Sequence, residues 1–430
     1  MKDKQRKASE EDCPWGFERP QFTREMKETH TILCPDIFPI HMRLVTEIFK
    51  MYGYRVEILR SRGRQVIQRG LEQVHNDMCY PAICMCGQQI DALTSGKYDP
   101  HKVALIQFQT GGGCRASNYI WMLRKALHNM GFDYVPVLSL SFSKVEKHSG
   151  FRITPMMMVK GLIAILYGDM MMLLKNQVKP YEQNPGDTDA VMDKWYAKLA
   201  DEMKHNRGLF GRALSKNLRA MAEDFHNIPR KTIKKTKVGI VGEIYVKYSA
   251  FGNNGLEDFL ASQGCEYMVP GVFPFFQYMF DCHLTERDLY GDGSRRGTLL
   301  SRIGAWVGAK LEKRFQKALE PYPEFVRPGT FRELRERGEK LLGRGVNMGE
   351  GWLLPAEIAE LVEKGYTNII CVQPFGCLPN HIVGKGVVRT IRNTYPHANI
   401  CPVDYDAGAS KVNQENRIKL MLALTEEEDG

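Results

Sequence analysis

Strand-like and helix-like stretches alternate over the first third of the chain. The apolar runs HTILCPDI from His30 and RVEILR from Arg55 predict short strands, and the segment PIHMRLVTEIFKMYGY between them predicts an amphipathic helix. Another apolar run, VALIQF (Val103 to Phe108), precedes WMLRKALHNMGF, which has helical spacing, and the strand-like run DYVPVLSLSF follows. This alternation is typical of a parallel sheet with crossover helices.

Between about 151 and 232 the pattern changes to helical spacing with few strand signals. The most apolar part, Ile153 to Leu174, contains Lys160 and Asp169, so it predicts a buried, methionine-rich helical region and not a membrane span. The segments DAVMDKWYAKLADEMKHN and FGRALSKNLRAMAEDFHNI continue the helical pattern.

A second α/β pattern fills the rest of the chain. Strands are predicted at Val238 to Val241, in YMVPGVF from Tyr267, at Asn368 to Val372 and in NICPVDYD from Asn399, with helical segments between and after them. We therefore expect an α/β protein with two Rossmann-like parallel-sheet lobes and a site in the cleft between them. The expected divisions are a flexible leader (1–28), a first lobe (29–150), a helical connection (151–236) and a second lobe (237–430).

Composition and charge narrow the function classes. The 430 residues carry a formal net charge of +9, and no aromatic-interleaved basic stripe accompanies the charge, which disfavours a nucleic-acid-binding role. The N-terminus, MKDKQRKASEEDCPWGF, lacks the apolar core of a signal peptide, so a cytoplasmic protein that does not bind membranes is expected. Eleven cysteines in a cytoplasmic chain argue against a disulfide framework and leave buried thiols, redox thiols or metal ligands.

Two common nucleotide signatures are missing. GIVGEIY after the strand at Val238 to Val241 lacks the G-x-G-x-x-G spacing of a dinucleotide site, and no G-x-x-x-x-G-K-[ST] motif occurs. Binding of NAD or of ATP by this chain is therefore weakly supported.

Three cysteines share one context, a turn that contains glycine or proline and leads into a helix. Cys114 follows GGG at a strand-to-helix turn, Cys377 lies in QPFGCLPNHI, and Cys79 begins CYPA. A helix N-terminus favours a thiolate, and Arg115 beside Cys114 does the same. A plain tight turn or a phosphate-binding glycine loop with an unrelated cysteine remains the alternative at Cys114.

A set of ligands rich in thiolate and without a recurring histidine suits an iron-sulfur cluster better than catalytic zinc. Three protein thiolates on a four-iron cluster leave one iron open to water or to a substrate oxygen. Cys84 and Cys86 form a C-x-C pair without a second pair, which argues against a finger-type zinc site and leaves packed thiols as the alternative. Cys34 lies at a strand end, where sites collect.

Three other residues are candidates near these turns. Glu243 follows a strand and is the best-placed carboxylate for proton transfer, with a solvated strand-end acid as the alternative. Arg115 and His381 are candidates to orient an anionic substrate, or they cap helices.

Six runs together resemble the 2-hydroxyacyl-CoA dehydratase family, and in particular the dehydratase-like part of its large activase-related members. The runs are CYPA, GGGCRASNY, GEIYVKY, GEGWLL, QPFGCLPNHI and DYDAGASKVNQENRIK. The resemblance covers nearly the whole chain from about His30. It implies two or more Rossmann-like lobes and a [4Fe-4S] cluster held by Cys79, Cys114 and Cys377.

The resemblance also implies a partner and a reaction. A separate ATP-dependent activase with its own iron-sulfur cluster would supply a low-potential electron for radical dehydration of an acyl-CoA, and a homo- or heterodimer is expected. Relatives with a double-cubane cluster reduce small molecules instead, and the extra thiols of Cys34, Cys84 and Cys86 are candidates for such a cluster. A non-catalytic electron-relay or assembly subunit and a metal-free ligand-binding protein are the alternatives.

Overall fold

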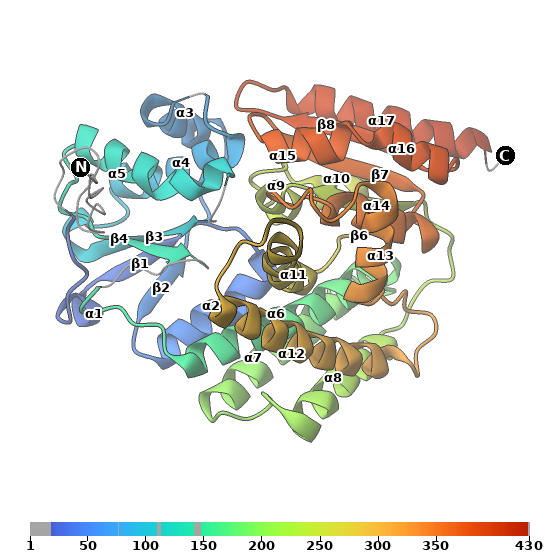
Figure 1. The fold of residues 1–430 in the computed structure, drawn as a ribbon, viewed down its shortest axis with the longest axis horizontal. Helices are drawn as coiled ribbons and strands as arrows, with labels where there is room; N and C mark the ends of the chain where they lie inside the picture. Colours follow the sequence, from blue (N-terminus) through green and yellow to red (C-terminus); the bar gives the residue numbers. More distant parts are fainter. Residues whose placement is uncertain (1–18, 76, 110–112, 142–147, 429–430) are drawn as a thin grey trace. The chain divides into compact units, whose positions relative to one another are not determined.

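The chain divides into two compact units in the computed structural model, which describes residues 19–75, 77–109, 113–141 and 148–428 (Figure 1). The first unit comprises Met1–Asp36, Phe49–Met78 and Ala82–Ile153, and the second comprises Ile37–Ile48, Cys79–Pro81 and Thr154–Gly430. Each unit contains one four-stranded parallel sheet, so the predicted α/β class is confirmed.

The first sheet is built from short strands that the apolar runs predicted. Its strands are β1 (Thr31–Cys34), β2 (Arg55–Ile58), β3 (Val103–Gln109) and β4 (Val137–Ser141). Its helices are α1 (Met26–Thr29), α3 (Arg64–Gln73), α4 (Tyr80–Thr94) and α5 (Tyr119–Asn129), of which α3, α4 and α5 lie on one side of the sheet (Figure 1). α3 was not predicted. Residues 19–28, placed in the leader by the sequence, include the buried Phe22.

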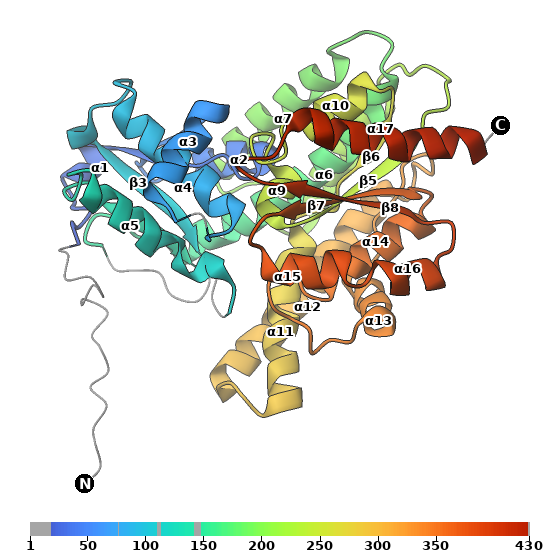
Figure 2. The same ribbon diagram turned by 90° about the horizontal axis from the view of Figure 1, so that it is seen from above.

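The second sheet consists of β5 (Lys237–Gly242), β6 (Glu266–Met268), β7 (Asn368–Pro374) and β8 (Asn399–Tyr405). Helices cover both of its faces, with α10 and α17 on one side and α14 and α16 on the other (Figure 2). The helices of this unit are α2 (Pro39–Met51, shared with the first unit), α6 (Pro155–Val178), α7 (Asp187–Lys204), α8 (Gly211–His226), α9 (Ile244–Tyr248), α10 (Leu256–Ser262), α11 (Phe273–Tyr290), α12 (Arg295–Leu319), α13 (Phe331–Leu341), α14 (Leu353–Glu363), α15 (Leu378–Asn380), α16 (Val388–Thr394) and α17 (Lys411–Glu428).

The two sheets share one strand order. The first runs β2-β1-β3-β4 and the second β6-β5-β7-β8, so in each sheet the first strand of the chain lies between the second and the third. All pairings are parallel. The point between first and third strand, where the direction of chain progression reverses, is where open α/β sheets bind ligands at their carboxyl edge.

Helix α6 is a buried helix, as its sequence predicted, but it belongs to the second unit and not to a separate connection. Thr154 caps it by accepting a hydrogen bond from the backbone N–H of Met157, and Pro155 occupies its first turn. By length and composition the segment Pro155–Tyr181 would suffice to cross a membrane, but 78% of its most apolar window is buried in the protein. Its Asp169 carboxylate accepts hydrogen bonds from the His41 ring and from the backbone N–H groups of Val272 and Phe273, where α11 begins.

One strand prediction is wrong in its extent. The run YMVPGVF reads as a strand, but β6 ends at Met268 and Phe273 already begins α11. Pro270 has no N–H to donate to a sheet ladder, so the strand cannot continue through it.

Gly242 at the end of β5 has a conformation that other residues rarely adopt. Its φ is +133°, and a Cβ there would lie 2.2 Å from the carbonyl oxygen of Val372. Gly242→Ala should therefore lower the free energy of unfolding by roughly 2–4 kcal/mol, measured by urea denaturation. Gly264→Ala is the control, because its φ is +73° with open space around it. Equal losses in both variants would contradict the role of the close approach.

Candidate functional site

The carboxyl ends of β5 and β7 meet at the centre of the second sheet. The two strands are neighbours, with Gly242 paired with Val372. Glu243 follows β5 directly, and Cys377 follows β7 after a turn through Phe375 and Gly376. A strand end and a cysteine turn that lie far apart in sequence therefore meet at the switch point of this sheet.

The turn after β7 holds the Cys377 side chain at the start of a helix. Gly376 has a φ of +75°, and the Cys377 N–H donates to the carbonyl of Pro374 at 3.2 Å. The Cys377 side chain is 7% exposed, and the backbone N–H of Asn380 donates to its sulfur. The turn is thus a backbone cradle around a buried thiol.

Cys79 lies in the same unit as Cys377. The backbone N–H of the next residue, Tyr80, donates to the carbonyl of Phe375 at 2.9 Å, which fixes the CYPA run to the cysteine turn. Cys79 is 4% exposed and close enough to Cys377 that its charge raises the pKa of that thiol. The structure therefore brings together two of the three predicted ligands.

Buried carboxyl groups surround the Cys377 thiol. Burial is the largest cause that raises the pKa of this thiol, and the negative charges of Glu350 and Glu243 raise it further. Glu243 is itself buried, contrary to the solvated alternative, and burial followed by repulsion from Glu350 raises its pKa to about 8. Burial also raises the pKa of Glu350. At neutral pH this pair can hold a proton, which suits a group that donates or accepts one.

Backbone N–H groups orient both acids. Glu243 caps α9 by accepting from the N–H of Val246 at 2.9 Å, and Glu350 accepts from the N–H of Ile244 at 2.9 Å. Glu350 belongs to the GEGWLL run, whose Gly349 and Gly351 have φ of +62° and +47°. These glycines let the loop turn sharply and present the carboxylate to the end of β5.

A buried ion pair lies beside the acids. Lys247 on α9 donates to both carboxylate oxygens of Glu357 on α14, at 3.0 and 3.2 Å, and both side chains are at most 5% exposed. Burial raises the pKa of Glu357, and Lys247 opposes that shift. The ion pair ties the helix that follows β5 to the helix that precedes β7.

Asn380 offers a test of whether the cradle suits a bound group. The residue is fully buried, and neither its amide nitrogen nor its amide oxygen has a hydrogen-bond partner in the described part of the chain. Leaving such atoms unpaired costs about 1–3 kcal/mol, so a polar or inorganic group beside them is favoured. Among the described residues nothing brings a third ligand to Cys79 and Cys377, so the binding of a cluster by these thiols stays a prediction.

Cys114 and Arg115 lie in the first unit. Cys114 is half-buried and precedes a 3₁₀ turn at Arg115–Asn118, with its carbonyl accepting from the Ser117 N–H at 3.0 Å. The exposed Arg115 guanidinium donates to the carbonyl of Asp77. Two of the three glycines before Cys114 lie outside the described residues. A role of Cys114 as third ligand and of Arg115 in substrate binding stays a prediction.

The other candidate thiols are buried. Cys34, Cys84 and Cys86 are at most 1% exposed, and none of the described cysteines forms a disulfide. Burial raises the pKa of Cys34. Among the described residues no group of three or more His, Cys, Asp or Glu side chains is arranged to hold a metal ion. All three thiols are buried, and their ligation of a cluster stays a prediction.

His381 contacts the cysteine turn. Its Nδ1 lies 2.9 Å from the Cys377 carbonyl oxygen, and its backbone N–H also donates to that oxygen at 3.1 Å. The contact fits the capping alternative, and a role of His381 in orienting a substrate stays a prediction.

Sequence reasoning missed Glu350, Lys247 and Glu357 as parts of this site. All three lie in or near runs that were quoted for the resemblance alone. A lysine and a glutamate 110 positions apart give no spacing signal, but an acid within a G-x-G run is one that could have been noticed.

No family model matches this chain, and neither does any curated protein. The likeness to the 2-hydroxyacyl-CoA dehydratase family therefore stays a prediction from its motifs.

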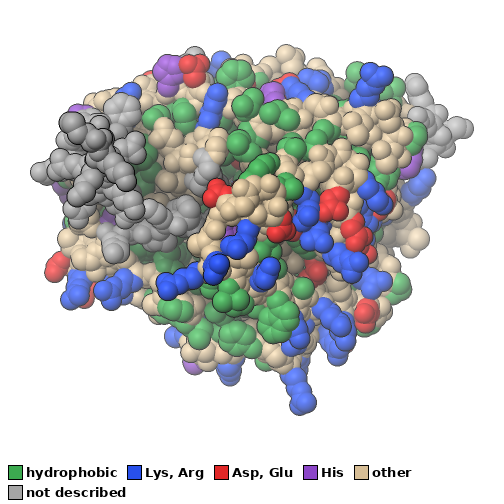
Figure 3. All heavy atoms as spheres, in the orientation of Figure 1, with side chains coloured by type: hydrophobic (Ala, Val, Ile, Leu, Met, Phe, Trp, Pro, Cys, Tyr) green, Lys and Arg blue, Asp and Glu red, His purple; other side chains and the backbone are tan. Residues whose placement is uncertain are grey.

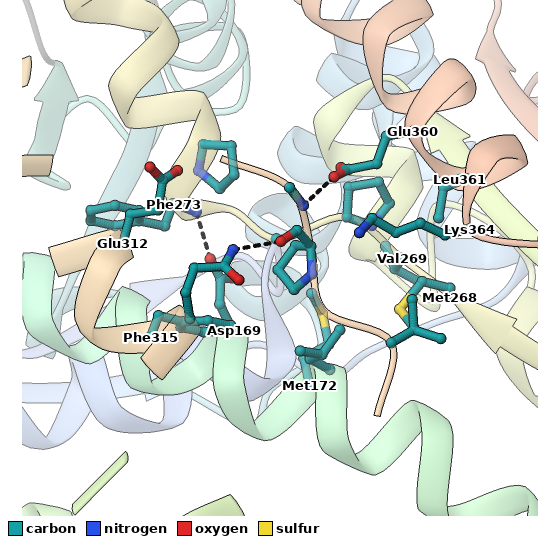
Figure 4. A pocket seen from close by; sticks show the side chains of 18 of the residues that line it. Asp169, Met172, Met268, Val269, Phe273, Glu312, Phe315, Glu360, Leu361 and Lys364 are labelled. Carbon is teal, nitrogen blue, oxygen red and sulfur yellow. Dashed lines mark hydrogen bonds between the residues drawn. The ribbon is translucent and has the colours of Figure 1, made fainter. Parts of the chain in front are cut away.

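A separate pocket lies wholly within the second unit (Figure 4). Side chains of α6, α11, α12 and α14 line it, together with the segment after β6, and its cavity volume is about 70 Å³. Apolar side chains dominate its walls, while the carboxyl groups of Glu312 and Glu360 enter from opposite sides. Burial raises the pKa of both acids, that of Glu312 to about 7. The pocket suits a small apolar group with a hydrogen-bond donor.

Glu312 makes stability depend on pH. Its folded-state pKa of about 7 exceeds the ordinary 4.5, so the folded chain binds more protons than the unfolded chain between these values. The contribution of Glu312 to the free energy of unfolding is therefore present below about pH 4.5 and is lost as pH rises through about 7. Between about pH 5 and about pH 8, the urea midpoint of Glu312→Gln should therefore fall less than the urea midpoint of the parent chain. The exposed Glu320→Gln, at the end of the same helix, is the control and should follow the parent; an equal slope in both variants would refute the assignment.

Proposed function

We propose that this chain is an iron-sulfur protein of the kind found among 2-hydroxyacyl-CoA dehydratase components. In this proposal it takes low-potential electrons from an ATP-dependent activase and uses them for radical dehydration or reduction of a small substrate such as an acyl-CoA. The observation that carries the proposal is the meeting of Cys79 and Cys377 beside Glu243 and Glu350 at the carboxyl edge of the second sheet.

The proposal includes two Rossmann-like lobes with the cluster in the cleft between them, in a cytoplasmic protein. The shared strand order supports it, because in both sheets the predicted ligand follows the third strand, Cys114 after β3 and Cys377 after β7. When bound, the cluster would supply one-electron reduction and an open iron that acts as a Lewis acid.

The residues of this chain would then have distinct roles. Cys79, Cys114 and Cys377 hold the cluster, and the buried positions of Cys79 and Cys377 keep water away from it. Glu243 holds a proton near neutral pH and can exchange it with a substrate, while burial and, after it, the charge of Glu350 raise its affinity for that proton. Arg115 and His381 orient an anionic substrate.

The test is anaerobic reconstitution with iron and sulfide, followed by an iron count and an absorption spectrum. Absorbance near about 400 nm with about four irons per chain is expected for one four-iron cluster, and a colourless product would contradict the proposal. Adding activase, ATP and 2-hydroxyacyl-CoA thioesters then separates an enzyme from an electron-relay subunit, because a relay takes up electrons without turnover.

A further inference from the structure

The outer face of helix α12 carries large apolar side chains that no described element of the second unit covers. α11 and α12 form an antiparallel helical hairpin whose turned end projects beyond the other helices of the second unit (Figure 2). We define the hairpin patch as the six large apolar residues near this end. They are Leu289, Tyr290, Leu299, Leu300, Ile303 and Trp306, between 49% and 68% exposed. Exposed apolar patches of this kind mark interaction sites.

On α12 the small residues face α11 and the large apolar residues face outward, which is the reverse of what a helix packed within a monomer needs. The residues of α12 that face α11 are small: a Cβ added at Gly304 would lie 2.6 Å from the Phe280 ring, and one at Gly308 would lie 3.1 Å from Gln277. Thr298 and Ser301 are also buried, and the Thr298 hydroxyl accepts from Arg287 of α11 at 2.9 Å. A helix that serves a monomer alone would turn its leucines inward and its small polar residues outward. The outward leucines therefore belong to an interface.

The charges on the hairpin end are divided between its two helices. The start of α12 carries Arg295, Arg296 and Arg302, all exposed, while the end of α11 and the turn carry the exposed Asp288 and Asp292. In the described part of the chain no carboxylate lies within 4.0 Å of these three arginines. Figure 3 shows Lys and Arg side chains bordering hydrophobic ones over α12. The end of the hairpin is thus complementary to itself: a cationic helix start lies beside an acidic helix end.

We propose that the hairpin patch is the contact between two copies of this chain, related by a two-fold axis. In such an isologous contact α12 of one copy lies against the end of α11 of the other, so that arginines meet aspartates twice while leucines and Trp306 pack between them. If each of the six side chains loses on the order of 100 Å² of accessible surface, the two copies together bury about 1,200 Å². This area is at the lower end of the range for specific interfaces. Trp306 is the expected anchor, because tryptophan and arginine dominate interface energetics.

The test is the molar mass of the full-length chain by sedimentation equilibrium and light scattering. A dimer is expected at micromolar concentration, with dissociation at least about tenfold weaker for Leu300→Glu and for Trp306→Glu. Leu420→Glu is the matched control, because Leu420 is 65% exposed on α17. A variant with Arg295→Asp and Arg302→Asp should pair with a variant with Asp288→Arg and Asp292→Arg more tightly than either pairs with itself.

Three results would overturn the proposal. They are a monomeric parent chain at about 100 μM, a dimer that Leu300→Glu and Trp306→Glu leave intact, and a monomer that instead sediments with phosphatidylcholine and phosphatidylglycerol vesicles through the same residues. Urea midpoints of all variants show that a change in mass does not come from unfolding. The test needs neither cluster nor activase, so it is independent of the proposed function.

Discussion

Replacing Cys377 with alanine should remove most of the iron that the chain takes up on anaerobic reconstitution. The thiol is buried in a backbone cradle, near enough to Cys79 for the charge of Cys79 to raise its pKa, and its loss takes away one of three expected thiolates from a cluster with one open corner. We expect at least about a tenfold fall in iron and sulfide per chain, together with loss of absorbance near about 400 nm. Cys79→Ala should give the same result.

The control for this experiment is Cys265→Ala. Cys265 is 2% exposed and precedes β6, so its replacement removes a buried thiol without touching the cysteine turn. It should keep the full iron content. Circular dichroism of the cluster-free proteins separates loss of ligands from loss of fold. Full iron in Cys377→Ala and Cys79→Ala would rule out the ligand assignment.

Replacing Lys247 with methionine should destabilise the chain by about 3–5 kcal/mol, because it leaves the buried Glu357 carboxylate without its cation. Both partners are at most 5% exposed, and Glu350 is a further negative group that acts on Glu357. Urea denaturation measures the loss. The double variant Lys247→Met with Glu357→Leu should recover much of it, since an apolar pair avoids the buried charge altogether.

An exposed ion pair provides the comparison for Lys247. Arg332 and Glu336 are 2.9 Å apart on α13, with side chains 81% and 50% exposed, so Arg332→Met should cost less than about 1 kcal/mol. A loss in Lys247→Met no larger than this, or no recovery in the double variant, would mean that the buried pair does not stabilise the fold.

Most strands and long helices were predictable from periodicity alone. The run VALIQF gave β3, the spacing after Trp121 gave α5, and the apolar Asn368 to Val372 gave β7. Helix α11 was missed because its first residues, FPFFQYMF, are apolar on every side and carry no helical period. α3 has only two buried residues, so its pattern was too polar to stand out.

The chemistry of the candidate site was predictable only in part. A cysteine in a glycine turn at a strand end is a local signal, and it pointed to Cys377. The raised pKa of Glu243 depends on burial and on Glu350, which lies in a loop more than a hundred positions away and is brought in by packing alone. No pattern in one sequence reports such a pairing, because long-range contacts leave no period.

The second unit takes one of its helices from the start of the chain. Ile37–Ile48 belongs to it, and His41 in this stretch holds the buried Asp169 carboxylate at 2.8 Å. During translation α2 is therefore synthesised long before the rest of the second unit. It cannot pack against its neighbours in that unit until they have been synthesised. For the same reason, a fragment 154–430 produced alone would lack Ile37–Ile48 and Cys79–Pro81 of the second unit, whereas a fragment 1–153 would contain every segment of the first unit. Recovery of a severed chain would require co-expression of both pieces.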